Sequence, residues 1–242
     1  MFSYRYRRPS FTVDNVVFGI DEGSDGICQL QVLLIKRKDD PFKGCWALPG
    51  GFVEVSDEGD QGEDLEDAAR RELDEEAGIK VAYREQLATF GKPKRDPRGR
   101  VISVVYYALV RSKQHVAKAG SDASEAAWWP VSEALREIRQ RTAFDHDEIL
   151  ALALKRLRAK VRYEPIIFGL VPREFSLSEL QAVYEAVLER PLDRRNFRKR
   201  LLAMDILNPA GQRGTGGRKA TTYTFDRKNY DMQVGRGLQF AL

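Results

Sequence analysis

The chain has 242 residues, of which 43% are hydrophobic, and its 40 lysine and arginine residues outnumber its 36 aspartate and glutamate residues. This length exceeds the roughly 100–200 residues of a typical domain and predicts one large domain or two smaller ones. No apolar run approaches the roughly 20 residues of a membrane span, and the basic N-terminus lacks the apolar part of a secretory signal, so we expect no membrane association.

Cys28 and Cys45 are the only cysteines of the chain. Two isolated thiols provide neither a disulfide framework nor a metal-binding pattern. Because free thiols are typical of reducing compartments, the expected location is the cytoplasm.

Positive charge is concentrated in the C-terminal third of the chain. Residues 161–242 contain 14 basic and 9 acidic residues, whereas residues 1–160 contain 26 and 27. Within the window Arg190–Lys228 the counts are 11 and 3. This segregation predicts two domains, residues 1–160 and residues 161–242, of which the second faces a polyanion.

The first domain combines strand patterns with helical patterns at intervals, which predicts an α/β fold. Branched and aromatic residues mark the strands, and apolar residues at helical spacing mark the helices. The predicted strands are Thr12–Ile20, Leu30–Lys36, Lys80–Phe90, Val101–Val110 and a further strand that ends with Ala127–Val131. The predicted helices are Leu65–Ala77, Ser132–Gln140 and His146 to about Lys160.

The helix predicted over Leu65–Ala77 carries an acidic face. Glu72, Glu75 and Glu76 fall at i, i+3 and i+4, so their carboxylates lie on one side of the helix. Like charges at these spacings repel, and anions near a helix C-terminus oppose the macrodipole. A solvated surface is the simplest explanation of such a face, whereas a bound Mg²⁺ ion would explain why the three carboxylates gather.

The residues around this acidic face favour the metal site. Arg71 is adjacent, and its rigid fork of donors can hold a carboxylate in one rotamer. Gly78 suits the left-handed conformation that ends a helix. Gly50-Gly51 lets the backbone approach a ligand closely. Together these residues predict a ligand site at the junction of a glycine turn and the helix.

The two histidines give no support to zinc chemistry. Asp145 is expected to cap the helix that begins at His146, and a lone histidine at a helix start is more often a capping or packing group than a catalyst. His115 lies in a polar loop. Because no two histidines have the spacing of a metal site, a zinc centre is not expected.

The second domain begins with an apolar linker and a capped helix. Residues 162–171 form a linker that docks apolar side chains. Ser176 and Glu179 then have the spacing of a capping box, and apolar residues follow at helical spacing. These features predict a helix that starts immediately after Ser176.

A second helix is predicted over about Arg194–Met204, with Asp193 as its N-cap. Phe197, Leu201 and Met204 face inward at i, i+4 and i+7. A glycine-rich basic loop and a returning strand over Thr221–Phe225 follow. Helix, turn, basic helix and basic hairpin make up the layout of a winged helix-turn-helix.

In that motif the second helix enters the major groove of DNA, and flanking cations contact phosphates. Arginine and asparagine side chains recognise guanine and adenine edges. A solvated basic face and a winged helix used for protein contacts are the alternatives. The predicted DNA-binding residues are Arg194, Arg195, Asn196, Arg198, Lys199, Arg200, Arg213, Arg218 and Lys219.

The segment from Gly50 to Ile79 resembles the signature of the Nudix hydrolases. In that family a glycine is followed by five residues, a glutamate, seven residues and then Arg-Glu-aliphatic-x-Glu-Glu-x-Gly-aliphatic. Glu63 and the run Arg71–Ile79 complete the second half. In the first half, eleven residues separate Gly51 from Glu63, which predicts a lengthened loop and leaves the geometry before the helix open. The resemblance implies a Nudix α/β/α sandwich.

A Nudix domain followed by a basic winged helix resembles the Nudix-related transcriptional regulators of NAD metabolism. The resemblance covers nearly the whole chain, through segments such as Trp46–Phe52, Arg95–Gly99, Phe144–His146 and Leu192–Phe197. It implies that the Nudix domain senses ADP-ribose or a related nucleotide. It also implies a homodimer that binds double-stranded operator DNA as a repressor.

Many such regulators have lost carboxylates of the signature, whereas this chain retains all of them. The resemblance therefore implies hydrolysis of a nucleoside diphosphate derivative with Mg²⁺ or Mn²⁺, for example ADP-ribose to AMP and ribose 5-phosphate. The expected metal-binding groups are Glu72, Glu75, Glu76 and the Gly51 backbone, and Arg71 would orient the carboxylates. The expected base lies in the loop before Trp128, with Glu125 as first choice and Asp122 as second. Arg95 and Arg98 are the candidates for contacts with phosphate or ribose.

Three functions stay open from the sequence. The first is a regulator that also hydrolyses its ligand. The second is a sensor-repressor whose intact signature only binds. The third is a housekeeping ADP-ribose pyrophosphatase whose C-terminal domain mediates protein contacts.

Overall fold

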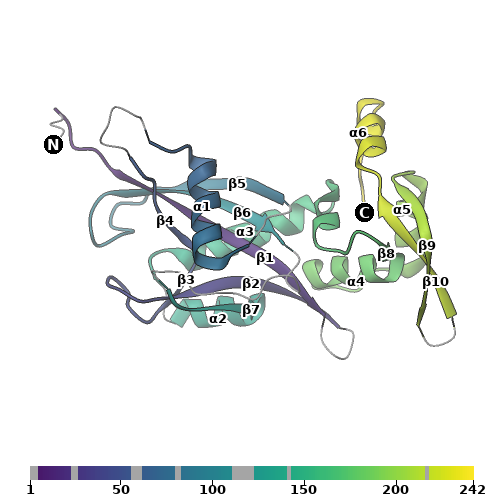
Figure 1. Ribbon diagram of the computed structural model, residues 1–242, viewed down its shortest axis with the longest axis horizontal. Coiled ribbons are helices and arrows are strands. Elements are labelled where there is room, and N and C mark those ends of the chain that lie inside the picture. Colours follow the sequence, from purple (N-terminus) through teal and green to yellow (C-terminus); the bar gives the residue numbers. More distant parts are fainter. Residues whose placement is uncertain are drawn as a thin grey trace. The chain divides into compact units, whose positions relative to one another are not determined.

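The computed structural model describes residues 5–22, 27–55, 62–79, 83–110, 123–140, 143–215 and 218–242, without the side chains of residues 76, 77, 137–140, 215 and 218 (Figure 1). The chain divides into two compact units. One contains residues 1–19 and 31–154, and the other contains residues 20–30 and 155–242. Among the described residues, no helix combines the length and the apolarity that crossing a membrane requires.

A mixed seven-stranded sheet forms the centre of the first unit. Its main path runs β3-β2-β1-β6-β5, while β4 pairs with β1 and β7 pairs with β2. Strands β1 and β6 are parallel, and the other pairs with known register in this sheet are antiparallel. The strands are β1 (Ser10–Glu22), β2 (Cys28–Arg37), β3 (Trp46–Ala47), β4 (Gly50–Phe52), β5 (Tyr83–Phe90), β6 (Val101–Leu109) and β7 (Ala123–Pro130).

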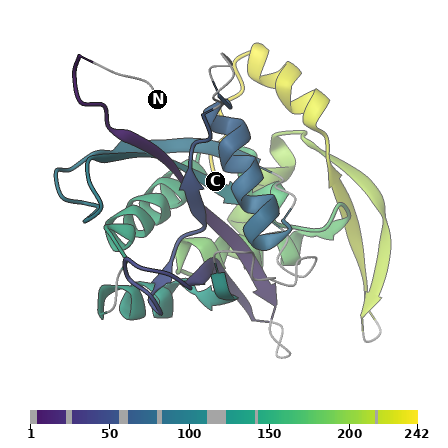
Figure 2. The ribbon, with the colours of Figure 1, turned by 60° about the vertical axis from the view of Figure 1, so that its left-hand side comes forward.

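Helix α1 (Leu65–Ala77) covers one face of this sheet, whereas α2 (Val131–Gln140) and α3 (His146–Lys160) lie toward the other face (Figures 1 and 2). Leu73 of α1 packs with Val17, Leu33 and Ala108 from three neighbouring strands. Because the inward residues of α1 and of the strands are apolar, their burial fixes the helix against the sheet. The predicted α/β class is confirmed.

Local signals define both ends of α1. The carboxylate of Asp64 accepts a hydrogen bond from the backbone of Glu66, which is N-capping. Gly78 adopts the left-handed conformation with φ of 62°, and its N–H donates to Asp74 O at 3.1 Å. The predicted helix end at Gly78 is therefore confirmed.

Two predicted loops belong largely to strands. The glycine-rich basic loop after the second helix of the C-terminal domain is mostly strand β9 (Leu207–Thr215), because it pairs with the strand that follows it. The second case is the segment before Trp128. Strand β7 begins at Ala123 and pairs along β2, with Glu125 opposite Lys36. The segment that contains Glu125 was predicted to be a loop because its polar residues hide the alternation of a strand. Pairing with the buried strand β2 overrides this local preference. Asp122 lies outside the described residues.

The second unit has the architecture of a winged helix-turn-helix (Figure 1). Strands β8, β10 and β9 form a small antiparallel sheet in that order. Stacked rings of Phe168 and Phe225, with centroids 4.2 Å apart, join the linker to this sheet. The elements are a 3₁₀ helix over Pro165–Gly169, β8 (Phe175–Ser176), α4 (Leu177–Leu188), α5 (Arg194–Ala203), β9 (Leu207–Thr215), β10 (Arg218–Phe225) and α6 (Arg227–Gly235).

The predicted helix starts of this unit are confirmed. Ser176 and Glu179 form the capping box, since each side chain bonds the other residue's backbone N–H. Asp193 accepts from Asn196 N at 2.8 Å and caps α5. The inward side of α5, with Phe197 and Leu201, is buried as predicted. Helix α6 is absent from the predicted elements, although Asp226 caps it by the same chemistry.

Gly78→Ala is expected to lower the free energy of unfolding by about 1 kcal/mol, because alanine is strained in the left-handed conformation. An added Cβ meets nothing within 4 Å, so the backbone alone causes the loss. Gly235→Ala is the matched control, because Gly235 also faces open space but lies in α6 without a positive φ. Chemical denaturation that finds Gly78→Ala as stable as the wild type would contradict the assignment.

Candidate functional site

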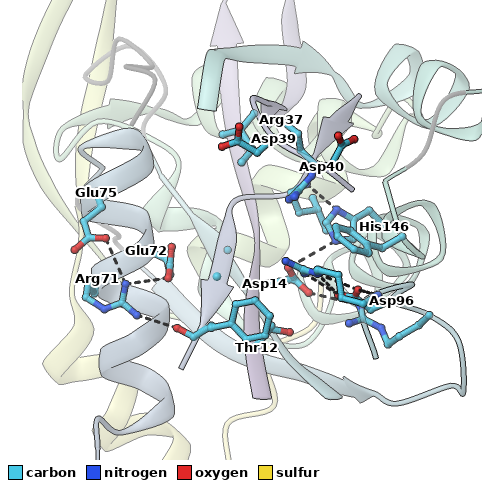
Figure 3. Close-up of a pocket in the computed structure, with 18 of the residues that line it drawn as sticks. Thr12, Asp14, Arg37, Asp39, Asp40, Arg71, Glu72, Glu75, Asp96 and His146 are labelled. Atoms are coloured by element: carbon cyan, nitrogen blue, oxygen red, sulfur yellow. Dashed lines mark hydrogen bonds and ion pairs between the residues drawn. The ribbon is translucent and has the colours of Figure 1, made fainter. Parts of the chain in front are cut away.

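A cavity of about 470 Å³ lies between helix α1 and two segments on the other side, the connection from β5 to β6 and the start of α3. Figure 3 shows Glu72 and Glu75 on one side of it, and Asp14, Asp96 and His146 on the other. The lining residues are Thr12, Asp14, Ile35, Arg37, Asp39, Asp40, Leu48, Gly50, Gly51, Phe52, Glu54, Arg71, Glu72, Glu75, Arg95, Asp96, Arg98, Phe144 and His146.

Arg71 organises the carboxylates on the α1 side of the cavity (Figure 3). Its Nε and Nη2 donate to the two oxygens of Glu63 at 3.1 and 2.6 Å. Its Nη1 donates to Glu72 at 2.9 Å and to Glu75 at 3.3 Å. The hydrogen bonds from Arg71 to Glu63 lower the pKa of Glu63 below its ordinary value. One guanidinium therefore orients three carboxylates, as the rigid fork of arginine allows.

The lengthened loop before α1 leaves this geometry intact. Glu63 N donates to Glu54 O at 3.2 Å, and Glu54 N donates to Glu63 Oε1 at 2.9 Å. This reciprocal contact closes the loop at its base. Because the closure places Glu63 beside Arg71, the contacts of Glu63 do not depend on the number of residues in between.

Glu72 is held between the helix and the glycine turn. A Cβ built on Gly51 would lie 2.2 Å from Glu72 Oε1, so a side chain at position 51 would displace this carboxylate. Burial raises the pKa of Glu72 above its ordinary value, despite the hydrogen bond from Arg71. A buried carboxylate that faces a cavity is stabilised in its charged form by a cation.

The donors around Glu72 suit a hard divalent cation, which prefers oxygen ligands. Within the described side chains, no group of three or more carboxylate, histidine or cysteine ligands has the geometry of a formed metal site. Glu75 contributes a largely exposed carboxylate. The side chain of Glu76 lies outside the described residues, so the third predicted ligand is not placed.

A buried ionic cluster forms the opposite wall of the cavity. Arg95 donates to both oxygens of Asp145, at 3.0 and 2.6 Å, and lies 3.6 Å from Asp14 Oδ2. Only 3% of the Arg95 side chain is exposed. Although burial opposes the shift, these carboxylates raise the pKa of Arg95. Arg95 therefore lines the cavity while its fork is engaged with the protein.

His146 packs in the same wall. Its Nδ1 accepts a hydrogen bond from Leu48 N at 2.9 Å, and its Nε2 lies 3.6 Å from Asp14 Oδ1. Burial lowers the pKa of His146, so the neutral form is favoured. Because Nδ1 is an acceptor, the proton of this neutral ring is on Nε2. This buried, hydrogen-bonded environment is compatible with the packing role that the sequence favoured for His146 over a catalytic one.

Arg98 lies close to two aromatic side chains of the cavity. Its guanidinium is 4.9 Å from the ring centroid of Phe52 and 5.6 Å from that of Phe144. Its fork donates to both oxygens of Asp96, at 3.0 and 2.7 Å. Arg98 remains 41% exposed, unlike Arg95, so it presents a cation to the cavity that a ligand can reach.

The cavity has more acidic than basic side chains. Among the described residues, seven aspartates and glutamates line it, against four arginines. All four arginines contact other residues of the protein, including Arg37, whose Nε donates to Pro41 O at 2.8 Å. A diphosphate that enters such a cavity meets an excess of negative charge unless cations accompany it.

Several lining residues were not among the predicted site residues. Asp14, Asp39, Asp40, Phe52, Asp96 and Phe144 belong to this group. Asp14 had a detectable signal, because it is a charged residue within the apolar run of a predicted strand. Glu125, by contrast, is not among the lining residues and lies 3.6 Å from Lys36 Nζ. Its role as a base stays a prediction.

The second unit presents the predicted basic surface. Arg194, Arg195, Asn196, Lys199 and Arg200 are exposed on α5, and Lys219 is exposed on β10. Arg198 and Arg213 bond to residues near the start of α4. The side chain of Arg218 lies outside the described residues. Helix α5 and the hairpin of β9 and β10 therefore both carry exposed cations.

Comparison with known proteins covers both units. The NUDIX domain family matches residues 15–153, and the NrtR DNA-binding winged helix domain family matches residues 167–225. The ADPR responsive transcriptional repressor NtrR of Acinetobacter baylyi is 36% identical over 236 residues, which cover 97% of this chain and 89% of that protein. The ADP-ribose pyrophosphatase of Methanocaldococcus jannaschii is 41% identical over 145 residues, which cover 60% and 73%.

Solved structures of NrtR from Shewanella oneidensis are similar as well. The structure with a 27-mer DNA has a TM-score of 0.75 and 33% identity, and covers 91% of this chain and 95% of that chain. The structure of its Nudix domain with ADP ribose has a TM-score of 0.53 and 35% identity, and covers 63% and 90%. The chain thus belongs to the Nudix-related transcriptional regulators, in which a Nudix domain precedes an NrtR-type DNA-binding winged helix domain.

Proposed function

We propose that this protein is a transcriptional repressor of NAD metabolism that binds operator DNA and responds to ADP-ribose or a related nucleoside diphosphate derivative. The observation that supports this proposal most directly is that one chain contains both features. The first unit has a cavity lined by the Nudix carboxylates, and the second has a helix, α5, with exposed cations. The relatives support this combination, since one is named an ADPR responsive repressor and another was solved with DNA. Action on DNA implies a cytoplasmic protein, and symmetric operators suit a homodimer.

The ligand is proposed to enter together with Mg²⁺ or Mn²⁺. Glu72, Glu75 and Glu76 would hold the metal, with the Gly51 backbone beside them. A divalent cation there neutralises charge on a diphosphate and lowers the pKa of bound water. The excess of acidic side chains in the cavity supports this proposal, because the lining arginines are already paired with protein groups and do not offset that charge.

The protein's own residues define how a diphosphate is held. Arg71 keeps Glu72 and Glu75 in fixed rotamers, so the carboxylates need no rearrangement when the ligand binds. Arg98 can offer positive charge from the opposite side. The aromatic rings of Phe52 and Phe144, which line the cavity, supply apolar surface that excludes water.

Hydrolysis of the ligand to AMP and ribose 5-phosphate is proposed as a second property of the same cavity. Complete signature residues and the pyrophosphatase relative support it. A sensor that binds without hydrolysis is the alternative. A housekeeping hydrolase is less well supported, because the second unit matches a DNA-binding domain.

Glu72→Gln is expected to reduce Mg²⁺-dependent hydrolysis of ADP-ribose by about 10–100-fold or more, because a neutral amide is a poorer ligand for a hard cation. Product formation measured by chromatography tests this expectation. Glu66→Gln is the matched control, since Glu66 is on the same helix but does not line the cavity. If the wild type shows no metal-dependent turnover, the hydrolase proposal fails and the sensor alternative stands.

Gly51→Ala is expected to weaken ADP-ribose binding at least about tenfold, since the added methyl overlaps Glu72 and forces the carboxylate away. Gly91→Ala is the control, because its Cβ would have no contact nearer than 3.7 Å. Isothermal titration calorimetry measures both affinities. Equal affinity of Gly51→Ala and the wild type would rule out a ligand site at the glycine turn.

The double variant Arg195→Ala plus Lys199→Ala is expected to lower the affinity for DNA. It is also expected to reduce the slope of log affinity against log salt concentration by about two, since two phosphate contacts are lost. Fluorescence anisotropy over a range of salt concentrations measures the slope. Lys38→Ala plus Lys43→Ala removes the same charge from exposed positions of the first unit. An identical effect of both double variants would show that net charge, rather than α5, determines binding.

A further inference from the structure

The segment Glu174–Glu179 at the start of α4 bonds to both the hairpin strand β9 and helix α5 of the winged helix. On the hairpin side, Arg213 Nη1 donates to Glu179 Oε1 at 2.8 Å, and Arg213 Nη2 donates to Glu174 O at 2.9 Å. On the helix side, Arg198 Nη2 donates to Ser178 Oγ at 3.0 Å. Strand β9 and helix α5 are thus tied to one short stretch of chain.

Both oxygens of the Glu179 carboxylate accept hydrogen bonds in this arrangement. One oxygen accepts from Arg213, and the other accepts from Ser176 N at 2.6 Å in the capping box. The same side chain therefore starts α4 and holds the hairpin. Because a bidentate guanidinium fixes direction as well as distance, Arg213 sets the position of β9 relative to α4.

The remaining cations of this surface differ from Arg198 and Arg213. Within the described part of the chain, the side chains of Arg194, Arg195, Lys199, Arg200 and Lys219 have no hydrogen bond or ion pair in the structure, and all of them are exposed. Arg198 is half-buried against α4 instead. The basic residues thus separate into exposed cations that can reach phosphates and two arginines that bond within the domain.

We propose that Arg213 and Arg198 are positioning residues, which hold the hairpin and α5 on the start of α4, and that the exposed cations make the phosphate contacts. This inference rests on the proposed DNA-binding function. The pair of Arg213 and Glu179 is exposed by 47% and 36%, so it contributes little to folding stability. Its effect is on the relative placement of the two elements, and hence on sequence discrimination.

Arg213 could contact phosphate directly or position the hairpin, and these two roles predict opposite effects of Glu179→Ala on DNA affinity. If Arg213 contacted phosphate directly, Glu179 would compete with DNA, and Glu179→Ala would strengthen binding. If Arg213 positions the hairpin, Glu179→Ala weakens specific binding as Arg213→Ala does. The double variant is then no worse than either single variant, since both remove one interaction.

The test uses the full chain and two labelled DNA duplexes of equal length, one selected by the chain from a random library and one unrelated. Arg213→Ala is expected to reduce the ratio of the two affinities by about tenfold, with the salt slope unchanged. Arg213→Lys keeps the charge but lacks the fork, so it does not restore the ratio. Lys219→Ala, the control, lowers both affinities alike and reduces the slope by about one.

Two further variants separate positioning from simple loss of structure. Ser176→Ala removes the capping hydroxyl but keeps the contact of Glu179 with Arg213, so its affinity ratio stays near that of the wild type. Ser178→Ala and Arg198→Ala are expected to lower the ratio equally, because they remove the same hydrogen bond. Thermal unfolding checks that each variant is folded at the assay temperature.

The inference is overturned if Arg213→Ala reduces the salt slope as Lys219→Ala does, or if Arg213→Lys behaves as the wild type. Tighter binding by Glu179→Ala would overturn it as well. If the wild type binds neither duplex, the proposed DNA-binding function fails first, and the positioning role fails with it.

Discussion

The hydrogen bonds of Arg71 are the interaction on which the Nudix site depends. Three carboxylates on and before one helix repel one another, and the guanidinium holds Glu63, Glu72 and Glu75 apart in defined directions. Because Arg71 Nη2 also donates to Phe52 O at 3.2 Å, the same arginine ties strand β4 to α1. Loss of this single cation would leave the carboxylates of Glu63 and Glu72, which are largely buried, without the counter-charge that Arg71 supplies.

The two units use charge in opposite ways. The cavity gathers an excess of carboxylates, which favours an anionic ligand only when cations come with it. Helix α5 displays cations without partners in the described chain, which suits the phosphates of DNA directly. The two proposed ligands, a nucleoside diphosphate derivative and DNA, therefore meet surfaces of opposite charge.

Sequence reasoning succeeded where the deciding interactions are local. The end of α1 at Gly78, the capping box of Ser176 and Glu179, and the inward side of α5 depend on residues within a few positions of one another. It did not foresee that Arg95 is buried, because its bidentate partner Asp145 lies 50 residues later in the chain. Nor could spacing place Glu125 in a strand, since pairing with β2 decides that.

The reciprocal contact of Glu54 and Glu63 has a consequence for how such proteins are found. The loop is closed at its base, so its length can change while Glu63 stays beside Arg71. The interval between the glycine turn and the glutamate is then free to drift during evolution. A pattern search that fixes this interval would overlook this chain, whereas one that fixes only the seven residues between Glu63 and Arg71 would recover it.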